Sequence, residues 1–293
     1  MAISTSWTIK GRTVPLDRPL VMGILNVTPD SFSDGGRFFS LDAAVEQAKR
    51  LRHEGADIID VGGESTRPQG ARPIDAEEEG RRVLPVIRAI IKLVPGVVVS
   101  VDTVKAEVAH AALDAGASIV NDVSAFRLDP DMGEICASAG AGVVLMHSRG
   151  TVSDMGTYAH AHYEDVVRDV LAELRERVAV AKAAGVEATR IALDPGIGFA
   201  KRGEHSLDML AALHELSALG YPIVVGASRK RFLGEIAGVT EPSERVYATV
   251  GANVAALERG ARIFRVHDVA ANRQALDVAW AIQQRNVAEI ERS

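Results

Sequence analysis

The chain has 293 residues and a formal net charge of −6, with 47% hydrophobic and 25% charged residues. This length suits one large α/β barrel or two smaller domains. The composition is typical of a globular protein and excludes a disordered or fibrous one. A negative net charge, with Lys and Arg scattered along the chain, also argues against nucleic-acid binding.

The sequence predicts a cytoplasmic protein without a membrane partner. Its first 20 residues lack a basic stretch followed by an apolar one, and no later segment stays apolar for the roughly 18 residues of a membrane span. The single cysteine, Cys136, lies in a helical pattern without nearby His or Cys ligands. We therefore expect a buried, unreactive thiol.

The first predicted element is a β-hairpin over residues 7–16, where the sequence alternates around Lys10-Gly11. Eight short segments rich in Val and Ile follow and predict strands. They are residues 20–27, 56–63, 97–103, 118–124, 142–148, 191–198, 222–228 and 263–268. Ala-rich stretches with helical spacing, such as 41–55 and 163–185, separate these segments. Glycines typical of helix C-caps precede several strands: Gly55, Gly116, Gly140, Gly185, Gly220 and Gly260.

Strands that are apolar on both faces and alternate with helices predict a parallel sheet covered by helices. Eight such units close most naturally into a TIM barrel. We therefore expect one α/β domain over residues 1–293, a (β/α)8 barrel whose N-terminal mouth is plugged by the hairpin. In this fold the active site lies at the C-terminal ends of the strands.

Polar residues lie near the C-terminal end of nearly every predicted strand, either within it or directly after it. They are Asn26, Glu64 to Arg67, Asp102, Asn121, Asp122, His147, Asp194, Ser228 to Lys230, Arg265 and His267. A single Asp or Asn at a strand end is explained equally well as a cap, and for Asp122 and His147 we favour a structural role. The coincidence of so many polar groups at one end of a barrel indicates a binding site.

Alternation along a strand places Arg265 and His267 on one face, and likewise Ser100 and Asp102. An inward Arg without a partner is costly to bury. The Arg265 and His267 pair therefore indicates an anion site at the barrel mouth.

Eight sequence blocks occur in order along the predicted strands: NVTPDSFSDGG, GGESTRP, SVDT, IVNDVSA, LMHSRG, DPGIGF, GASRKRFLG and RVHDV. Together they resemble the dihydropteroate synthase family of pterin-binding enzymes. Eight blocks in this order leave little room for chance. The resemblance implies a transferase of folate biosynthesis that condenses 6-hydroxymethyl-7,8-dihydropterin diphosphate with 4-aminobenzoate. It releases pyrophosphate and forms 7,8-dihydropteroate with the help of Mg²⁺, and sulfonamides mimic 4-aminobenzoate in this family.

The resemblance also implies residue roles. Asn26 would coordinate Mg²⁺ on the diphosphate, whose phosphate oxygens would meet Arg265 and His267. The implied catalytic residues are Lys230, Asp102, Asp194, Arg265 and His267. The implied substrate-binding residues are Phe32, Thr66, Arg67, Pro68, Asn121, Met146, Phe199, Gly226 and Ser228. The 4-aminobenzoate site would be built partly by loops 26–36 and 64–71, and its carboxylate would meet the start of the helix after the seventh strand.

Two positions depart from the family pattern: Arg231 stands where relatives often have Ser, and Gln69 precedes Gly70 in the second loop. Relatives are typically homodimers, which implies the same here, with Trp280 and Ile282 as candidate surface residues.

Three alternative functions stay open on the sequence alone. A pterin-binding methyltransferase domain, which passes a methyl group from methyltetrahydrofolate to a corrinoid, would share the barrel and the pterin-edge residues. It is not expected to carry the Ser-Arg-Lys block with the Arg-x-His pair. A silent paralogue would bind pterin without turnover. A Schiff-base aldolase would use Lys230, and only the fold supports it.

Overall fold

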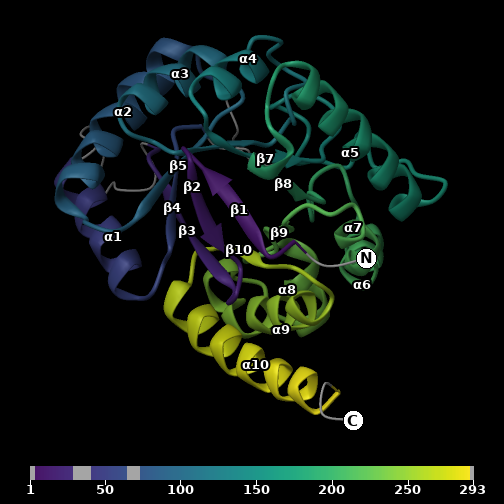
Figure 1. Ribbon diagram of the computed structural model, residues 1–293. Helices are drawn as coiled ribbons and strands as arrows, with labels where there is room; N and C mark the ends of the chain where they lie inside the picture. Colours follow the sequence, from purple (N-terminus) through teal and green to yellow (C-terminus); the bar gives the residue numbers. More distant parts are fainter. Residues whose placement is uncertain (1–3, 29–40, 65–72, 291–293) are drawn as a thin grey trace.

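The computed structural model describes residues 4–28, 41–64 and 73–290. Its parallel eight-stranded sheet closes into a barrel surrounded by helices (Figure 1), as the sequence predicts. The strands are β3 (Leu20–Asn26), β4 (Ile58–Gly62), β5 (Val98–Asp102), β6 (Ile119–Asp122), β7 (Gly142–Met146), β8 (Ile191–Asp194), β9 (Val224–Val225) and β10 (Ile263–Val266). Their order around the barrel is β8-β7-β6-β5-β4-β3-β10-β9. The barrel closes where Leu193 N donates to Pro222 O at 2.8 Å.

The two helices predicted over 41–55 and 163–185 form as α1 (Leu41–His53) and α5 (Val166–Ala183). The other helices that cover this sheet are α2 (Ala76–Leu93), α3 (Ala106–Asp114), α4 (Met132–Ser138), α6 (Gly203–Ala211), α7 (Leu213–Ser217), α8 (Arg231–Ala237), α9 (Val246–Glu258) and α10 (Val269–Ile290). All six glycines predicted as C-caps have φ between +65° and +111°. Glycine adopts this left-handed conformation without steric cost, so each turns the chain back towards the sheet.

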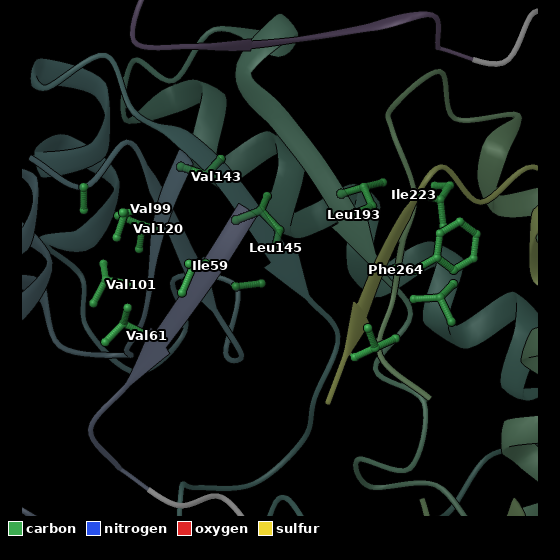
Figure 2. Packing of buried hydrophobic residues seen from close by; sticks show 14 of the residues in the cluster. Ile59, Val61, Val99, Val101, Val120, Val143, Leu145, Leu193, Ile223 and Phe264 are labelled. Atoms are coloured by element: carbon green, nitrogen blue, oxygen red, sulfur yellow. The ribbon is translucent and has the colours of Figure 1, made fainter. Parts of the chain in front are cut away.

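Strand alternation divides the core into an outer and an inner part. Side chains that point outward, among them Ile59, Val101, Leu145 and Phe264, pack against the helices (Figure 2). Inward side chains at the N-terminal ends of the strands form a second apolar cluster that includes Met22. Further along the same strands the inward positions become polar. The barrel interior therefore changes from an apolar plug to a polar layer along its axis.

The N-terminal hairpin closes the apolar end, as expected. Strands β1 (Ser6–Ile9) and β2 (Arg12–Pro15) are antiparallel and cross the barrel in Figure 1. Lys10 and Gly11 have φ of 44° and 73°, which suits the tight turns of two-residue hairpins. Trp7 is fully buried and its Nε1 donates to Arg190 O at 2.8 Å, just before β8. This end of the barrel is structural, and the opposite end carries the polar groups.

Cys136 is buried in α4, and burial raises the pKa of its thiol. The prediction of a buried, unreactive thiol agrees with this position. Across the described ranges, no helix combines the length and the apolar character that a membrane crossing requires.

Candidate active site

Strand register brings the predicted residues together at the C-terminal mouth. Asn26 is the register partner of Gly62, Gly62 of Asp102, and Asp102 of Asn121. Asp194 ends β8 as the partner of Met146. Because neighbouring parallel strands place register partners side by side, residues far apart in the sequence form one layer of the barrel.

Arg265 on β10 lies within hydrogen-bond distance of two carboxylates of this region. Its Nε donates to Asp60 Oδ2 and its Nη2 to Asp102 Oδ2, each at 2.6 Å. Asn121 Nδ2 donates to the same Asp60 oxygen at 3.0 Å. The inward position of Arg265 was predicted, but its pairing with Asp60 was not. The guanidinium is thereby fixed in plane and its charge is balanced within the protein.

Sequence patterns do not single out Asp60, because it lies inside the apolar strand IIDVG rather than at its end. It is fully buried, and its Oδ1 has no hydrogen-bond partner in the described part of the chain. A buried carboxylate needs a cation. The sequence signal for the Asp60–Arg265 pair was therefore that the predicted barrel places both an Asp and an Arg in its interior.

Burial perturbs the carboxylates of the mouth. It raises the pKa of Asp102 to about 7, against the opposing effect of Arg265 and with the help of Asp60. It raises the pKa of Asp194 to about 6, although Gly196 N donates to Asp194 Oδ1 at 2.7 Å. The pKa of Arg265 is raised, because Asp60 and Asp102 outweigh burial. Such perturbed groups in one cluster are typical of functional sites.

Lys230 and Phe199 line the same mouth. Lys230 Nζ lies 3.9 Å from the centroid of the Phe199 ring, and burial lowers the pKa of Lys230 to about 8. Gly226 lies beside Asp194, since a Cβ on it would approach Asp194 Oδ2 to 3.6 Å. These contacts place the Lys230 cation against the Phe199 ring and Gly226 beside the Asp194 carboxylate.

Ser228 and His267 contact each other directly. Ser228 Oγ lies 3.0 Å from His267 Nδ1 and accepts a hydrogen bond of 3.1 Å from His267 N. Arg229, between Ser228 and Lys230, instead pairs with Asp268 at 2.6 Å. Of the Ser-Arg-Lys block, Ser228 and Lys230 therefore belong to the site, and Arg229 has a structural partner.

Arg231, the departure from the family pattern, begins α8. Its guanidinium carbon lies 4.4 Å from the Tyr158 ring centroid, and its Nε lies 3.3 Å from Glu235 Oε1. The side chain is 59% exposed, so these contacts tie it to the protein surface.

Asn26 ends β3 at the mouth, half-buried. No group of three or more His, Cys, Asp or Glu suited to a metal occurs in the ranges 4–28, 41–64 and 73–290. A side-chain amide oxygen beside an anion-binding layer does fit Mg²⁺ that arrives with a diphosphate, because Mg²⁺ takes few protein ligands and keeps waters and phosphate oxygens. Four predicted substrate-binding residues lie outside the described residues: Phe32, Thr66, Arg67 and Pro68.

Asp122 and His147 have the structural contacts that we favoured. Asp122 points outward from β6, where its Oδ1 accepts from Ser124 N at 2.7 Å and its Oδ2 from Phe126 N at 2.8 Å. His147 follows β7, and its Nε2 lies 3.0 Å from Glu173 Oε2.

A second buried cation, Lys201, was not expected from the sequence. It is 1% exposed, and its Nζ lies 2.8 Å from His147 Nδ1. Burial lowers the pKa of Lys201 to about 7 and that of His147 to about 4. A lysine just after a glycine-rich loop is usually exposed, so no sequence signal distinguishes it.

Comparison with known proteins agrees with this geometry. Residues 22–267 match the family described as pterin binding enzyme. The chain belongs to the pterin-binding enzyme family. Within it, the chain is similar to dihydropteroate synthases, including one from Bacillus subtilis that is 47% identical over 86% of this chain and 85% of the relative.

Other relatives are longer. A probable bifunctional folylpolyglutamate synthase/dihydropteroate synthase from Haloferax volcanii is 48% identical over 94% of this chain, which spans only 32% of that relative. Among solved structures, dihydropteroate synthase from Xanthomonas albilineans with 4-aminobenzoic acid is 46% identical, with a TM-score of 0.88 over 96% of this chain and 98% of that one. A structure of the Xanthomonas enzyme with 7,8-dihydropteroate has a TM-score of 0.85 and 44% identity, over 95% of this chain and 98% of that one.

Proposed function

We infer that this chain catalyses the dihydropteroate synthase reaction, joining 6-hydroxymethyl-7,8-dihydropterin diphosphate to 4-aminobenzoate. The observation that carries this proposal is the cluster of Asp102, Asn121, Asp194, Lys230 and Arg265 at the barrel mouth. The cluster offers carboxylates for N–H donors and cations for oxygen acceptors. Membership of the pterin-binding family supports the assignment of a pterin to it.

The pterin ring presents several N–H donors and one carbonyl oxygen. Asp194 and Asp102 would accept from the donors, and Lys230 would donate to the carbonyl. One N–H of the Asn121 side chain donates to Asp60, which leaves its second N–H and its amide oxygen for the ring. Phe199 and Met146 would contact the apolar faces of the ring. Polar groups would thereby bind the edges of the ring, and apolar side chains would contact its faces.

The diphosphate would lie towards His267 and Arg265. Nε and one N–H of Nη2 of Arg265 are used by Asp60 and Asp102, so the two N–H groups of Nη1 and the second N–H of Nη2 remain as donors for phosphate oxygens. Asn26 would hold the Mg²⁺, which supplies positive charge to the leaving diphosphate when bound. Donors fixed in advance stabilise developing charge without reorganisation.

The reaction begins with cleavage of the bond between the pterin methylene carbon and the diphosphate oxygen. The diphosphate leaves with the electron pair, and the pterin retains a delocalised positive charge. Asp102 and Asp194 stabilise that charge in a shielded site. The arylamine nitrogen then donates its lone pair to the methylene carbon and loses one proton. The course is therefore SN1-like.

The arylamine would enter beside Ser228 and the start of α8, with its carboxylate towards the protein surface. Gly226 keeps space beside Asp194, where a side chain would narrow the site. Arg231 would not replace the serine contact of relatives directly, because its guanidinium is stacked on Tyr158.

A homodimer and a cytoplasmic location remain predictions. Ile282 on α10 is 61% exposed, which suits a surface that a second copy covers. Trp280 is half-buried and stacks with Arg262 at 4.9 Å, so it serves the protein's own packing. Val278, exposed on the same helix, is therefore a better candidate than Trp280 for a dimer surface that includes Ile282.

Incubation with the pterin diphosphate, labelled 4-aminobenzoate and Mg²⁺ tests the proposal. We expect labelled dihydropteroate and one pyrophosphate for each turnover, with loss of both on chelation by EDTA and recovery on added Mg²⁺. Pterin binding without pyrophosphate release would instead identify a silent paralogue. Methyl transfer from methyltetrahydrofolate to a corrinoid would identify the methyltransferase. Borohydride trapping of a carbonyl substrate on Lys230 would identify the aldolase.

A further inference from the structure

The end of β8 and the loop that follows it carry two residues of the proposed pterin site, Asp194 and Phe199, and the backbone of this loop needs external support. Gly196, Gly198 and Ala200 have φ of 67°, 76° and 44°. The value at Ala200 is unfavourable for a residue with a Cβ. A loop with three left-handed residues keeps one conformation only when its surroundings fix it.

Lys201 supplies that support through its buried ammonium group. Its Nζ lies 3.3 Å from both Gly196 O and Phe199 O, and 2.8 Å from His147 Nδ1. Three acceptors match the three N–H donors of an ammonium group. The two carbonyls belong to the residues at the start and end of the turn closed by Phe199 N and Gly196 O at 3.0 Å.

His147 and Glu173 hold Lys201 in turn. The pKa of His147 is lowered to about 4, chiefly by burial and then by Lys201, so the ring is neutral at pH 7. Its Nδ1 accepts from Lys201 while its Nε2–H donates to Glu173 Oε2 at 3.0 Å. Arg149 Nε also donates to Glu173, at 3.0 Å. The chain of contacts runs from the outer helix α5 to the loop.

The loop has no room to relax towards β7. A Cβ on Gly196 would lie only 1.9 Å from His147 O. On the site side, Gly196 N donates to Asp194 Oδ1, and Lys230 lies over the Phe199 ring. The orientation of the Asp194 carboxylate and the position of the Phe199 ring therefore depend on a turn that Lys201 fastens.

We propose that Lys201 is a positioning residue, which acts through the carbonyls of Gly196 and Phe199 to set the geometry of Asp194 and Phe199 for the pterin ring. This proposal takes the identity of the ligand from the proposed function. Lys201 itself does not contact the ligand, and its effect is specific to the pterin and not to the arylamine.

The first test needs no ligand. Lys201→Met keeps the length of the side chain and removes its donors. Hydrogen exchange of the amides of residues 196–200 should become at least tenfold faster in this variant, while β8 and α5 keep the wild-type rates. Wild-type exchange over residues 196–200 would overturn the proposal. The matched control is Lys182→Met, the same change at an exposed lysine of α5.

The second test separates the two substrates. In Lys201→Met the affinity for the pterin diphosphate, measured by calorimetry, should fall at least tenfold, while KM for 4-aminobenzoate stays within twofold of wild type. Equal losses for both substrates would indicate a general structural role and overturn the proposal.

If Lys201→Met does not fold, Lys201→Gln is the second variant, because it keeps one donor group. It should show a smaller pterin-specific loss, and a loss shared by both substrates would again overturn the proposal. A wild-type protein that binds no pterin would refute the proposed function, and hydrogen exchange would then decide the role of Lys201 alone.

Discussion

Asp60 and Arg265, 205 positions apart in the sequence, are joined by a hydrogen bond of 2.6 Å inside the barrel. Asp102 binds the same guanidinium from another strand at 2.6 Å. The cation expected to meet a diphosphate is thus held by two acids before any ligand arrives. This arrangement fixes the plane of the guanidinium. It also makes the stability of the barrel depend on the charge of Arg265.

Asp60→Asn removes one of these charges and keeps the shape of the side chain. We expect kcat/KM for the pterin diphosphate to fall at least tenfold, because Arg265 loses its fixed orientation. The free energy of unfolding should fall by about 1–3 kcal/mol, the range for disturbing a buried hydrogen bond. Steady-state kinetics and urea unfolding measure the two effects. Asp57→Asn is the control, because Asp57 pairs with Arg18 and Arg273 away from the site and should leave kcat/KM unchanged.

Arg265→Ala shows where the structure alters an expectation. From the sequence alone we expect severe loss of turnover with nearly unchanged thermal stability. The contacts instead predict a loss of about 3–5 kcal/mol, because two buried carboxylates would face each other without a cation. The double variant Asp60→Ala with Arg265→Ala should recover part of this loss in urea unfolding. Equal stability of Arg265→Ala and wild type would contradict this reading of the contacts.

Lys230→Met should separate activity from stability. Burial disfavours the charge of Lys230, since its pKa is lowered to about 8. Replacing it with an apolar side chain of similar length should leave the unfolding midpoint unchanged or raised. Turnover should fall at least 100-fold, about 2.7 kcal/mol of lost transition-state stabilisation at 1.36 kcal/mol per factor of ten. Turnover near the wild-type value would remove Lys230 from the site.

Asp194→Asn should change the pH dependence of stability. The folded pKa of Asp194 is raised from 3.8 to about 6. The folded state therefore binds more protons than the unfolded state between these values, and this group's contribution is fully present below pH 3.8 and lost as pH rises through 6. A shift of about two units corresponds to roughly 3 kcal/mol. Urea unfolding from pH 4 to pH 7 should show a shallower decline for the variant, and parallel curves would contradict the shift.

Trp7→Ala tests the hairpin at the other end of the barrel. The indole is fully buried in the inner cluster and donates to Arg190 O. Its removal should reduce the free energy of unfolding by about 3–5 kcal/mol, the usual cost of a large core deletion. Activity per folded molecule should stay near wild type, because the proposed site lies at the opposite mouth. A large fall in kcat below the unfolding temperature would mean that the hairpin also supports catalysis.

The fold and much of the site were predictable because they depend on local patterns. Val- and Ile-rich segments, amphipathic stretches and C-cap glycines gave the order of the barrel elements. Strand ends gave Asp102, Asn121 and Asp194, since polar side chains after apolar strands are visible in a single sequence. Asp60 and Lys201 were not predictable in this way, because the role of Asp60 depends on Arg265, 205 positions away, and the burial of Lys201 against His147 joins residues 54 positions apart.

The architecture, the polar end of the barrel and the resemblance to a pterin-binding family can all be read from the linear chain. Which charges meet depends on how the elements pack. The strands of the barrel join Arg265 to Asp60 and Asp102, and the packing of the loop after β8 against the end of β7 joins Lys201 to His147. The physical reason is that periodicity specifies the face on which a side chain lies, whereas an ion pair inside a barrel depends on the stagger of strands that are distant in the chain.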